Sequence, residues 1–536
     1  MKRTRKPLTF VLLLLAPLAL IGASDRPEVP AVETITAAEL HSIVSFLASD
    51  EMEGRDTGTT ENLIAAGYLA NQLELMGLKP AGDHGTFFQN FDVIRGRLGE
   101  PNALTLRRPD GTTISTELFE DFFPSPLSAS GTVSGSLAYV GYGITAPEFG
   151  VDDYSGADLR GRIAVIIAGS LDDELDDPSA GPVDTEYGRE SYKLFNAQQH
   201  GASGVILVAS RSWGSLRRQA RYRWPEGDAR VRLQLGEEVD KIHIPAVYVK
   251  LDLVQKAAGQ DLMDLNETEQ SGNGSSVRFL NASAAVDVHI DRTRIKTRNV
   301  LAELPGSDPF LRHDAVIVSA HLDHVGMQGR SVFHGADDDA SGSAGVLETA
   351  EAFTMAPSAP RRTVLFALWN AEEQGLLGSR FFVDHPTFPL ERIRAVFQMD
   401  MIGRNQEVTD PDDLRFEGMV KQTAEQNENT LNLVGYSRST DLEHLIETAD
   451  HSIGLKLLCQ MDDQPLQLIR RSDNWPFLVK GIPAMLFTTG LHPDYHTPAD
   501  TAAKLNYPKM ERVVRLIYLS ALQAAESAQP LHLNNR

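Results

Sequence analysis

The sequence predicts an α/β protein with a mostly parallel central sheet, helices on both faces of that sheet, and an inserted β-rich segment. Two observations support this fold class. From about residue 299 onward, apolar runs typical of buried strands alternate with segments of helical spacing, which indicates parallel strands joined by helices. Between about residues 101 and 288, short β runs are separated by Gly, Pro and Asp, which indicates a separate unit rich in strands.

The elements can be placed along the chain by their apolar periodicity. Helices are expected between about residues 37 and 82, and strands of the insert at 136–140, 162–167, 204–208 and 244–249. The strands of the central sheet are expected at 315–319, 363–369, 395–398 and 483–487. Helices in this part are expected at 343–353, 378–382, 442–454 and 509–526.

The first residues have the order of an export signal. A basic start from Lys2 to Lys6 is followed by an apolar run over 8–21 and then by Gly22-Ala-Ser24. The apolar run is shorter than the roughly 20 residues that a membrane span needs. We expect residues 1–24 to be a signal peptide and the mature chain to be exported, periplasmic or secreted, without a membrane span; an uncleaved anchor is the alternative.

Composition excludes several classes of function. The chain has 536 residues and a net charge of −23, so we expect no nucleic-acid partner, because phosphate backbones repel such a chain. Its single cysteine, Cys459, excludes an internal disulfide and cysteine-ligated zinc or iron–sulfur sites. Segment 211–224 mixes five arginines with Trp and Tyr, and we expect an exposed hairpin or lid there.

Acidic and histidine side chains follow four successive strands of the predicted central sheet. Ligands in open α/β sheets collect beyond the carboxyl ends of the strands, so these side chains are expected to lie close together. An Asp run also stands just before the helix expected at 343. The residues are His321, Asp323, His324, Asp337, Asp338, Asp339, Glu372, Glu373, Asp400 and His496.

Each of these side chains has a structural alternative when taken singly. The Asp run could cap the following helix, Glu372 and Glu373 could form an exposed helical turn, and His496 could be a hydrogen-bonded loop residue. Together, carboxylates crowded at one sheet edge would repel each other unless a cation neutralised them. Oxygen and imidazole ligands without thiolates suit zinc, with manganese or cobalt as the other candidates.

These segments resemble the motifs of the two-zinc (co-catalytic) aminopeptidase family, whose relatives include glutamate carboxypeptidases and glutaminyl cyclases. Two early segments, Leu47-Ala-Ser-Asp-Glu-Met-Glu-Gly-Arg55 and Gly77-Leu-Lys-Pro80, resemble exported bacterial members. The resemblance implies a zinc exopeptidase fold that holds two Zn²⁺ per chain. The five motifs are Ser319-Ala-His-Leu-Asp-His-Val-Gly326, Gly335-Ala-Asp-Asp-Asp-Ala-Ser-Gly342, Asn370-Ala-Glu-Glu-Gln-Gly375, Gln398-Met-Asp-Met401 and Tyr495-His-Thr-Pro-Ala-Asp500.

The resemblance implies a metal ligand set. Asp338 would bridge two metals, His321 and Asp400 would complete one site, and Glu373 and His496 would complete the other. The Asp338–Asp339 peptide is expected to be cis. His324 and His334 are assigned no ligand role, and packing or support of the ligands is the interpretation adopted for them.

The resemblance also implies catalytic and substrate-binding roles. Asp323 would accept the second ring N–H of His321 and fix its tautomer. Glu372 would be the general base, which takes a proton from a water that bridges the two metals and passes it to the leaving amine. Asn474 and Tyr495 are candidates for substrate binding. Relatives often carry His where Asn474 stands, and Asn cannot be a cation near neutral pH.

The insert resembles a protease-associated domain in the segments Tyr139-Val-Gly-Tyr-Gly-Ile144, Asp158-Leu-Arg-Gly-Arg162 and His200-Gly-Ala-Ser-Gly-Val205. A generic β insertion is the alternative. The expected organisation is a signal peptide over 1–24, the N-terminal part of the peptidase domain over 25–100, the insert over 101–290, and the zinc peptidase catalytic domain over 291–536.

The function implied is that of an exported zinc-dependent aminopeptidase acting on peptides with a free N-terminus. Carboxypeptidase or dipeptidase action on the same scaffold is an alternative, as are glutaminyl cyclisation and a non-catalytic receptor-like relative. The residue preference and the oligomeric state are not readable from the sequence.

Overall fold

The computed structural model describes residues 31–168, 187–209, 213–225, 232–262, 277–462, 464 and 466–534. The predicted signal peptide, residues 1–24, lies outside this range. Within it, no helix combines the length and the apolar character that crossing a bilayer requires.

The central sheet has four parallel strands at its core. These are β18 (Thr363–Trp369), β15 (Ala315–His321), β19 (Ile393–Met399) and β22 (Ala484–Thr488), in that spatial order. Antiparallel pairing extends the sheet on one side through β14 (Ile290–Leu304), β2 (Phe88–Leu98) and β11 (Gln234–Leu235), with β1 (Lys79–Pro80) pairing with β14. On the other side β20 (Thr430–Val434) pairs antiparallel with β22, and β21 (Lys456–Leu458) follows.

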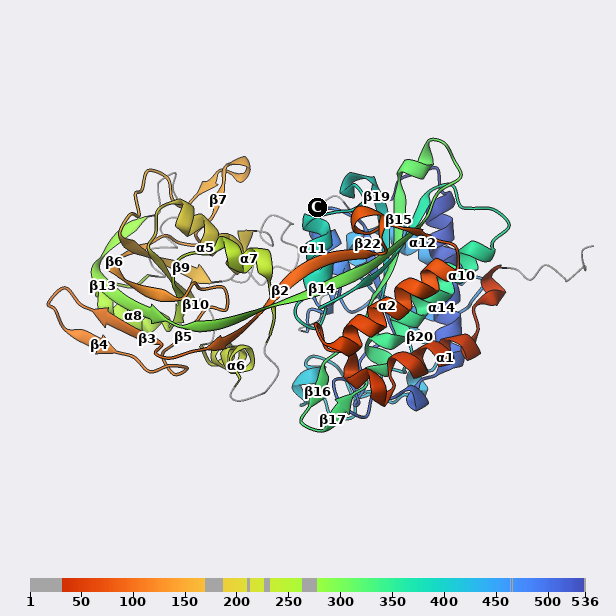
Figure 1. The fold of residues 1–536 in the computed structure, drawn as a ribbon, viewed down its shortest axis with the longest axis horizontal. Coiled ribbons are helices and arrows are strands. Elements are labelled where there is room, and N and C mark those ends of the chain that lie inside the picture. The colour runs from red at the N-terminus through yellow and green to blue at the C-terminus, as the bar shows by residue number, and fades with distance from the viewer. Residues whose placement is uncertain are drawn as a thin grey trace, which may run out of the picture.

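Helices cover both faces of this sheet, as predicted. One face packs against α1 (Ala37–Leu47), α2 (Thr60–Leu75), α10 (Gly342–Met355), α12 (Thr440–Asp450) and α14 (Tyr507–Glu526), and Figure 1 shows several of these helices side by side. The other face packs against α11 (Leu377–Asp384) and α13 (Asn474–Val479). Along β15, Val316 and Val318 enter one core and Ile317 the other, so the strands are apolar on both faces.

Polar side chains fix where several of these helices begin. Thr36 accepts a hydrogen bond from the Glu39 amide at the start of α1, and Ser439 accepts one from the Leu442 amide at the start of α12. Asn506 does the same for α14, whose first turn also contains a proline. These contacts satisfy amides that have no partner inside the helix.

The insert forms a second sheet with its own core. Its eight strands are, in spatial order, β4 (Thr113–Ser115), β3 (Ala103–Arg107), β13 (Arg278–Val288), β6 (Gly131–Tyr139), β9 (Arg162–Ala168), β10 (Gly204–Ala209), β12 (Ala246–Val249) and β5 (Phe122–Pro124). Helices α5 (Glu190–Gln199), α6 (Trp213–Arg223), α7 (Gly236–Lys241) and α8 (Leu251–Ala258) accompany it. Two small hairpins complete the strands: β7 (Thr145–Ala146) with β8 (Val151–Asp152), and β16 (Gly326–Gln328) with β17 (Ser331–Phe333), which follows the central strand β15 in the sequence.

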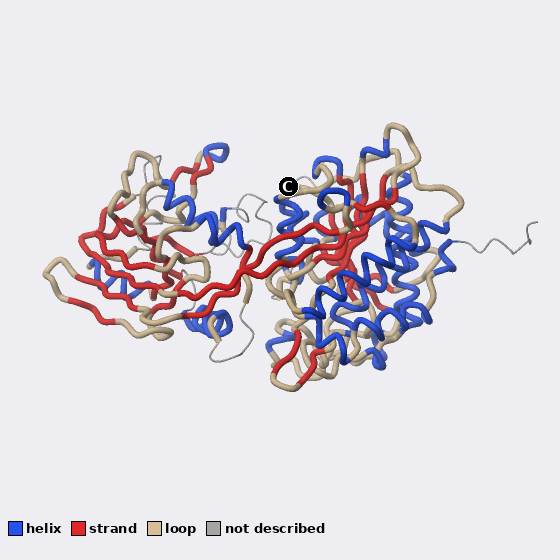
Figure 2. The backbone as a smooth tube through the Cα atoms, viewed as in Figure 1, coloured by secondary structure: helices blue, strands red, loops and turns tan. Residues whose placement is uncertain are grey.

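A long two-stranded ribbon joins the insert to the central sheet. Strands β2 and β14 pair from Ile290 opposite Leu98 to Val300 opposite Phe88, and Figure 2 shows them running between the two parts of the molecule. The expected domain boundary at 100 falls between β2 and β3, and the boundary at 290 falls on the first residue of β14.

One element differs from its prediction. Segment 211–224 was expected to be a hairpin or lid, but residues Trp213–Arg223 form helix α6. Trp224 is 6% exposed, lies in the core of the insert, and donates a hydrogen bond from its indole to the Pro124 carbonyl. The aromatic residue therefore anchors the segment, and a surface hairpin would leave it in water.

Glu348 in α10 provides a test of the packing between α10 and the N-terminal helices. It is 2% exposed, and burial together with the charges of Glu39 and Glu351 raises its pKa to about 8. A raised carboxyl pKa destabilises the fold as the pH rises from the unfolded value, near 4.5, through 8, because the unfolded chain ionises first. We expect Glu348→Gln to be more stable than the parent by a margin that grows across this window, on the order of a few kcal/mol at pH 8.

Urea unfolding at pH 5 and pH 8 measures this margin. Glu391→Gln, at an exposed position, is the control and should show the same pH profile as the parent chain. A Glu348→Gln margin that does not change between the two pH values contradicts the assignment.

Candidate metal centre

The sheet brings the predicted site residues to one edge. His321 is the last residue of β15 and stands opposite Trp369, the last residue of β18, so Glu372 and Glu373 follow at the same height. Asp400 directly follows β19, and the loop after β22 leads to His496. Because these four strands are parallel and in register, their carboxyl ends meet at one place.

Asp338 lies between two imidazoles. Its Oδ1 is 3.2 Å from His321 Nε2, and its Oδ2 is 3.0 Å from His496 Nε2. On the first side Asp400 Oδ1 is 3.7 Å from His321 Nε2. On the second side Glu373 Oε2 is 3.2 Å from His496 Nε2. The two oxygens of one carboxylate thus face two separate groups of donors.

The neighbours of Asp338 in the Asp run are held by backbone amides. Asp339 accepts hydrogen bonds from the amides of His321, Gly342 and Met401 at 2.9–3.2 Å. Asp337 accepts one from the Gly403 amide at 2.6 Å, and its other oxygen is 3.2 Å from His492 Nε2. Asp338 is therefore the member of the run whose carboxylate faces the site, and the peptide between Asp338 and Asp339 is cis, as expected.

His324, to which the sequence assigned no ligand role, belongs to this cluster. Its Nδ1 is 2.8 Å from Glu373 Oε1 and 3.7 Å from Asp338 Oδ2. His324, Asp338, Glu373 and His496 offer donor atoms within 4.8 Å of one another, as do His321, Asp339 and Asp400. The second histidine of the motif at 319–326 was the signal that could have placed His324 here.

The donor set fits cations. Four carboxylates (Asp338, Asp339, Glu373 and Asp400) meet three imidazoles (His321, His324 and His496) in a region that is mostly buried, with His496 34% exposed. His321 Nε2, Asp338 Oδ2 and Glu373 Oε1 are buried and form no well-aligned hydrogen bond within the chain, although an imidazole nitrogen and a carboxylate oxygen lie only 2.8–3.2 Å apart in each case. Buried nitrogen and oxygen atoms that crowd together without well-aligned hydrogen bonds are the arrangement that a metal ion would complete.

The electrostatics agree with this view. Burial raises the pKa of Glu372 and of Asp339 well above the usual range of a carboxyl. Burial alone would lower the pKa of His496, but the charge of Glu373 and the contact with Asp338 raise it to about 10. The cluster therefore attracts positive charge strongly, since crowded carboxylates need a counter-charge.

Asp323 acts differently from the expectation. His321 Nδ1 lies 3.1 Å from the backbone oxygen of Asp323 and 3.9 Å from its carboxylate, so the ring N–H is oriented by the carbonyl. The Asp323 carboxylate instead accepts hydrogen bonds from the Glu372 amide at 3.0 Å and from the Thr57 hydroxyl at 3.1 Å. Asp323 thus holds the backbone of the predicted base.

Arg55, the last residue of an early motif, ties two loops of the site together. Its guanidinium donates to the carbonyls of Leu322 at 3.0 Å, His334 at 2.8 Å and Gly335 at 3.0 Å, and also to that of Leu47. Leu322 follows His321, and Gly335 precedes the Asp run. Arg55 is 1% exposed, and burial lowers its pKa to about 10.

A small cavity of about 50 Å³ adjoins the cluster. Asp338, Glu372, Asp400 and His496 line one side. Apolar side chains form much of the remainder, namely those of Met401, Leu468, Leu486 and Leu491. Beyond the carboxylates the lining is therefore mixed, since the polar side chains of Arg471, Ser472, Thr488 and Tyr495 accompany the four apolar ones.

The two predicted substrate-binding residues differ in position. Tyr495 lines the cavity, and its ring stacks on His496 with centroids 3.9 Å apart. Asn474 is fully buried at the start of α13, donates to the Ile469 carbonyl, and is not among the lining residues. Its neighbours Arg471 and Ser472 line the cavity instead, and the Ser472 hydroxyl donates to Asp400 Oδ2 at 2.6 Å.

Arg55→Met tests the role of the buried guanidinium. The substitution leaves four carbonyls without their donor, so we expect a loss of about 3–5 kcal/mol in the free energy of unfolding. Zinc affinity should fall as well, because the two loops lose their common support. Urea unfolding and zinc titration measure the two effects, with the exposed Arg330→Met as control. Unfolding at the parent's urea concentration would show that Arg55 is not a support.

Comparison with known proteins finds a family match in the second half of the chain. Residues 299–521 match Peptidase family M28. Leucine aminopeptidase 2 of Trichophyton equinum is 28% identical over 280 residues, which cover 48% of this chain and 51% of that protein. Aminopeptidase YwaD of Bacillus subtilis strain 168 is 26% identical over 406 residues, which cover 73% and 70%. The chain spans about half the length of the first curated relatives that it matches.

A solved structure shares the fold. The aminopeptidase from Aneurinibacillus sp. strain AM-1 superposes with a TM-score of 0.51, covering 94% of this chain and 96% of that one at 21% identity. This likeness establishes the α/β fold with its covered sheet. The likeness to peptidase family M28 is thus carried by residues 299–521, the part of the chain that matches the family.

Proposed function

We propose that the mature chain is an exported di-zinc aminopeptidase that removes N-terminal residues from peptides. The observation that supports this best is the position of Asp338, whose two oxygens face His321 and His496 at 3.2 and 3.0 Å. A carboxylate placed in this way can serve two metals at once.

The proposed ligand sets combine the family resemblance with the contacts around Asp338. His321, Asp338 and Asp400 would hold one zinc, and Asp338, Glu373 and His496 the other, which leaves each zinc an open position. His324 Nδ1, 2.8 Å from Glu373 Oε1, would orient that carboxylate. Two zinc ions bound here would supply Lewis acidity, which polarises the scissile carbonyl and lowers the pKa of water.

Glu372 is the group that would move the proton. It lines the cavity, stands outside both groups of donors, and its Oε2 is 3.9 Å from His321 Nε2. Burial raises its pKa well above the usual range, and the bond from its amide to Asp323 fixes the start of its side chain. Glu372 would accept a proton from the attacking water and deliver it to the leaving amine.

The shape of the cavity suggests a substrate preference. Met401, Leu468, Leu486 and Leu491 would surround the side chain of the cleaved residue. An apolar side chain gains from such a lining, whereas a charged one would lose its hydration there. We therefore propose a preference for Leu or Met over Lys or Glu at the N-terminus.

Two further assignments complete the proposal. The apolar stretch that follows the basic start supports export of the chain. The separate eight-stranded unit, with the motifs at 139–144, 158–162 and 200–205, supports its assignment as a protease-associated domain.

Glu372→Ala should abolish turnover of leucine p-nitroanilide while zinc content stays at the parent's level, because the residue is not a ligand. A loss of about 10²–10⁴-fold in kcat is expected for removal of a general base. Glu391→Ala, at an exposed position, is the control. Near-normal turnover by Glu372→Ala would show that another group takes the proton.

His496→Ala and Asp338→Ala should lose metal. We expect Asp338→Ala to lose both zinc ions because it serves both sites, and His496→Ala to lose one first. Metal analysis after dialysis against a chelator, followed by zinc addition, gives the stoichiometry. A single zinc per parent chain would refute the paired site.

Blocking groups distinguish the direction of cleavage. An aminopeptidase should stop cleaving when the α-amine of a peptide is acetylated and should tolerate an amidated C-terminus. The opposite pattern would assign carboxypeptidase action to the same scaffold.

A further inference from the structure

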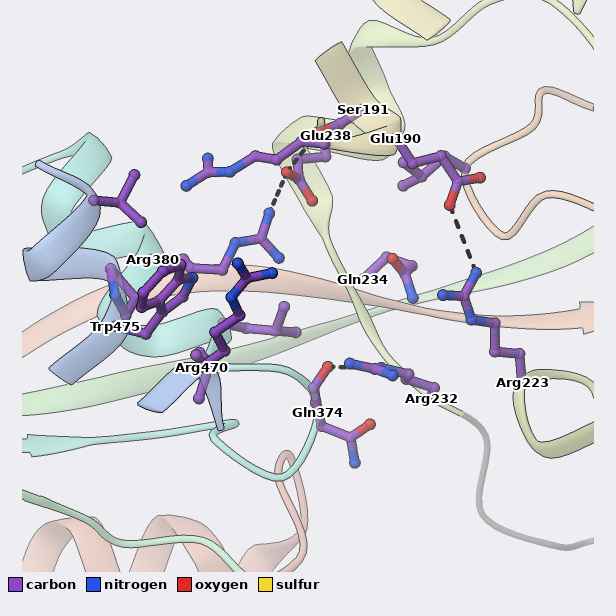
Figure 3. Close-up of a pocket in the computed structure, with 16 residues that line it drawn as sticks. Glu190, Ser191, Arg223, Arg232, Gln234, Glu238, Gln374, Arg380, Arg470 and Trp475 are labelled. Carbon is purple, nitrogen blue, oxygen red and sulfur yellow. Dashed lines mark hydrogen bonds and ion pairs between the residues drawn. The ribbon is translucent and has the colours of Figure 1, made fainter. Parts of the chain in front are cut away.

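A second cavity, of about 310 Å³, lies between the insert and the catalytic part. We call it the arginine pocket after five of its lining residues, which come from both parts. Arg380 lies on α11, Arg470 just before α13, and Figure 3 shows their side chains with those that the insert contributes. The other three arginines are Arg189, Arg223 and Arg232.

The arginine pocket is basic in a chain that is otherwise strongly acidic. Its lining contains two carboxylates, Glu190 and Glu238, against the five guanidinium groups. Glu190 lies 3.6 Å from Arg223, and Glu238 pairs with Arg380. Both lining carboxylates are therefore already engaged. Arg189 also pairs with Asp384 at 3.3 Å, so the surplus of positive charge is smaller than the number of arginines suggests.

Arg470 carries an important part of this surplus. Its guanidinium lies 5.2 Å from the centre of the Trp475 ring. Within the described part of the chain, no carboxylate forms an ion pair with Arg470, and its neighbour Trp475 also lines the cavity. Three further polar side chains, those of Ser191, Gln234 and Gln374, also line the cavity.

Two chain segments connect the arginine pocket to the candidate metal centre. Glu372 lines the catalytic cavity, and Gln374, two residues later, lines the arginine pocket. Arg471 lines the first and Arg470 the second, and consecutive Cα atoms are about 3.8 Å apart. The two cavities are therefore neighbours, and an extended peptide, which advances about 3.3–3.6 Å per residue, can reach from one to the other.

The insert contacts the catalytic loop directly at this point. Arg232 Nε donates to the Gln374 carbonyl at 3.1 Å, and the Leu233 amide donates to the Gln374 side chain at 2.9 Å. A Cβ on Gly375, where φ is +104°, would lie 2.3 Å from the Arg232 guanidinium. The glycine of the motif at 370–375 thus lets an arginine approach the loop that carries Glu372.

We propose that the arginine pocket binds a carboxylate of the peptide substrate, a few residues beyond the cleaved bond. Guanidinium groups bind planar carboxylates through two parallel hydrogen bonds, which Arg470 can offer here. The carboxylate is that of an acidic side chain or of the C-terminus. This inference rests on the proposed function, and it gives the enzyme a preference for short peptides with an acidic group at a set distance.

Matched peptides test the proposal on the full-length, zinc-loaded enzyme. The series is Leu followed by five alanines with an amidated C-terminus, in which Glu or Gln replaces the alanine at position 3, 4, 5 or 6. A second series contains peptides of three to six residues without Glu, and each length is made with a free C-terminal carboxylate and with an amidated C-terminus. Release of leucine gives kcat/KM for each, and the Glu-to-Gln and acid-to-amide ratios separate the two sources of carboxylate.

We expect the Glu-to-Gln ratio of kcat/KM to reach about five- to tenfold at one peptide position, or the acid-to-amide ratio to do so at one peptide length. This is the gain expected from one charge-assisted hydrogen-bond contact. Added salt should reduce it, because the cavity is open to solvent. The variants Arg470→Gln and Arg223→Gln should bring this ratio of kcat/KM values toward one. Arg470 belongs to the part with the central sheet, and Arg223 belongs to the insert. Arg107→Gln, an exposed arginine of the insert, should leave it unchanged.

The outcomes separate this inference from the proposed function. If the enzyme does not cleave leucine p-nitroanilide, the proposed function fails. If it cleaves that amide but all ratios are near one, the arginine pocket does not bind substrate carboxylates. A ratio that persists undiminished in both arginine variants also overturns the inference, since the carboxylate then binds elsewhere.

Discussion

A buried carboxylate held between two imidazoles is the constraint on which the site depends. Asp338 is 3% exposed, and a charge in that position is costly unless opposite charges face it on both sides. The fold meets this requirement because β15 ends at His321 and the loop after β22 delivers His496 to the opposite oxygen. The order of the parallel strands therefore sets the geometry of the site, and the local sequence around Asp338 supplies only one of its parts.

Hydrogen bonds from surrounding residues fix the loops on either side of Asp338. Asp337 and Asp339 are occupied by backbone amides, and Asp500 accepts the amides of Asp337 and Asp338 at 3.0–3.2 Å. Arg55 binds the carbonyls that flank the same loops. A site held within this framework keeps its donor atoms in place before any ligand arrives, which limits the reorganisation that binding would require.

The insert contributes arginines to a cavity beside the carboxylate-rich edge of the central sheet. Carboxylates dominate the cluster around Asp338, whereas arginines dominate the neighbouring cavity, and Arg232 contacts the loop that separates them. A peptide that carries a positive amine at one end and a carboxylate farther along matches this distribution of charge. The long ribbon of β2 and β14 holds the two parts in the same molecule while each keeps its own core.

The sequence by itself determined the four central strands, the helices on both faces and the residues that follow the strand ends, because apolar periodicity and strand-end position are local properties. The family resemblance also singled out Asp338 as the metal-bridging residue. Residue type alone could not do so, because Asp337 and Asp339 on either side are also aspartates. Tertiary structure alone decided that His324 joins the cluster, that the Asp323 carboxylate holds the Glu372 amide, and that Asn474 is buried away from the cavity. It also turned the expected hairpin at 211–224 into a helix and brought five scattered arginines together. These outcomes depend on contacts between residues far apart in the sequence, such as Asp323 and Glu372, which are 49 positions apart. No local sequence pattern encodes such contacts.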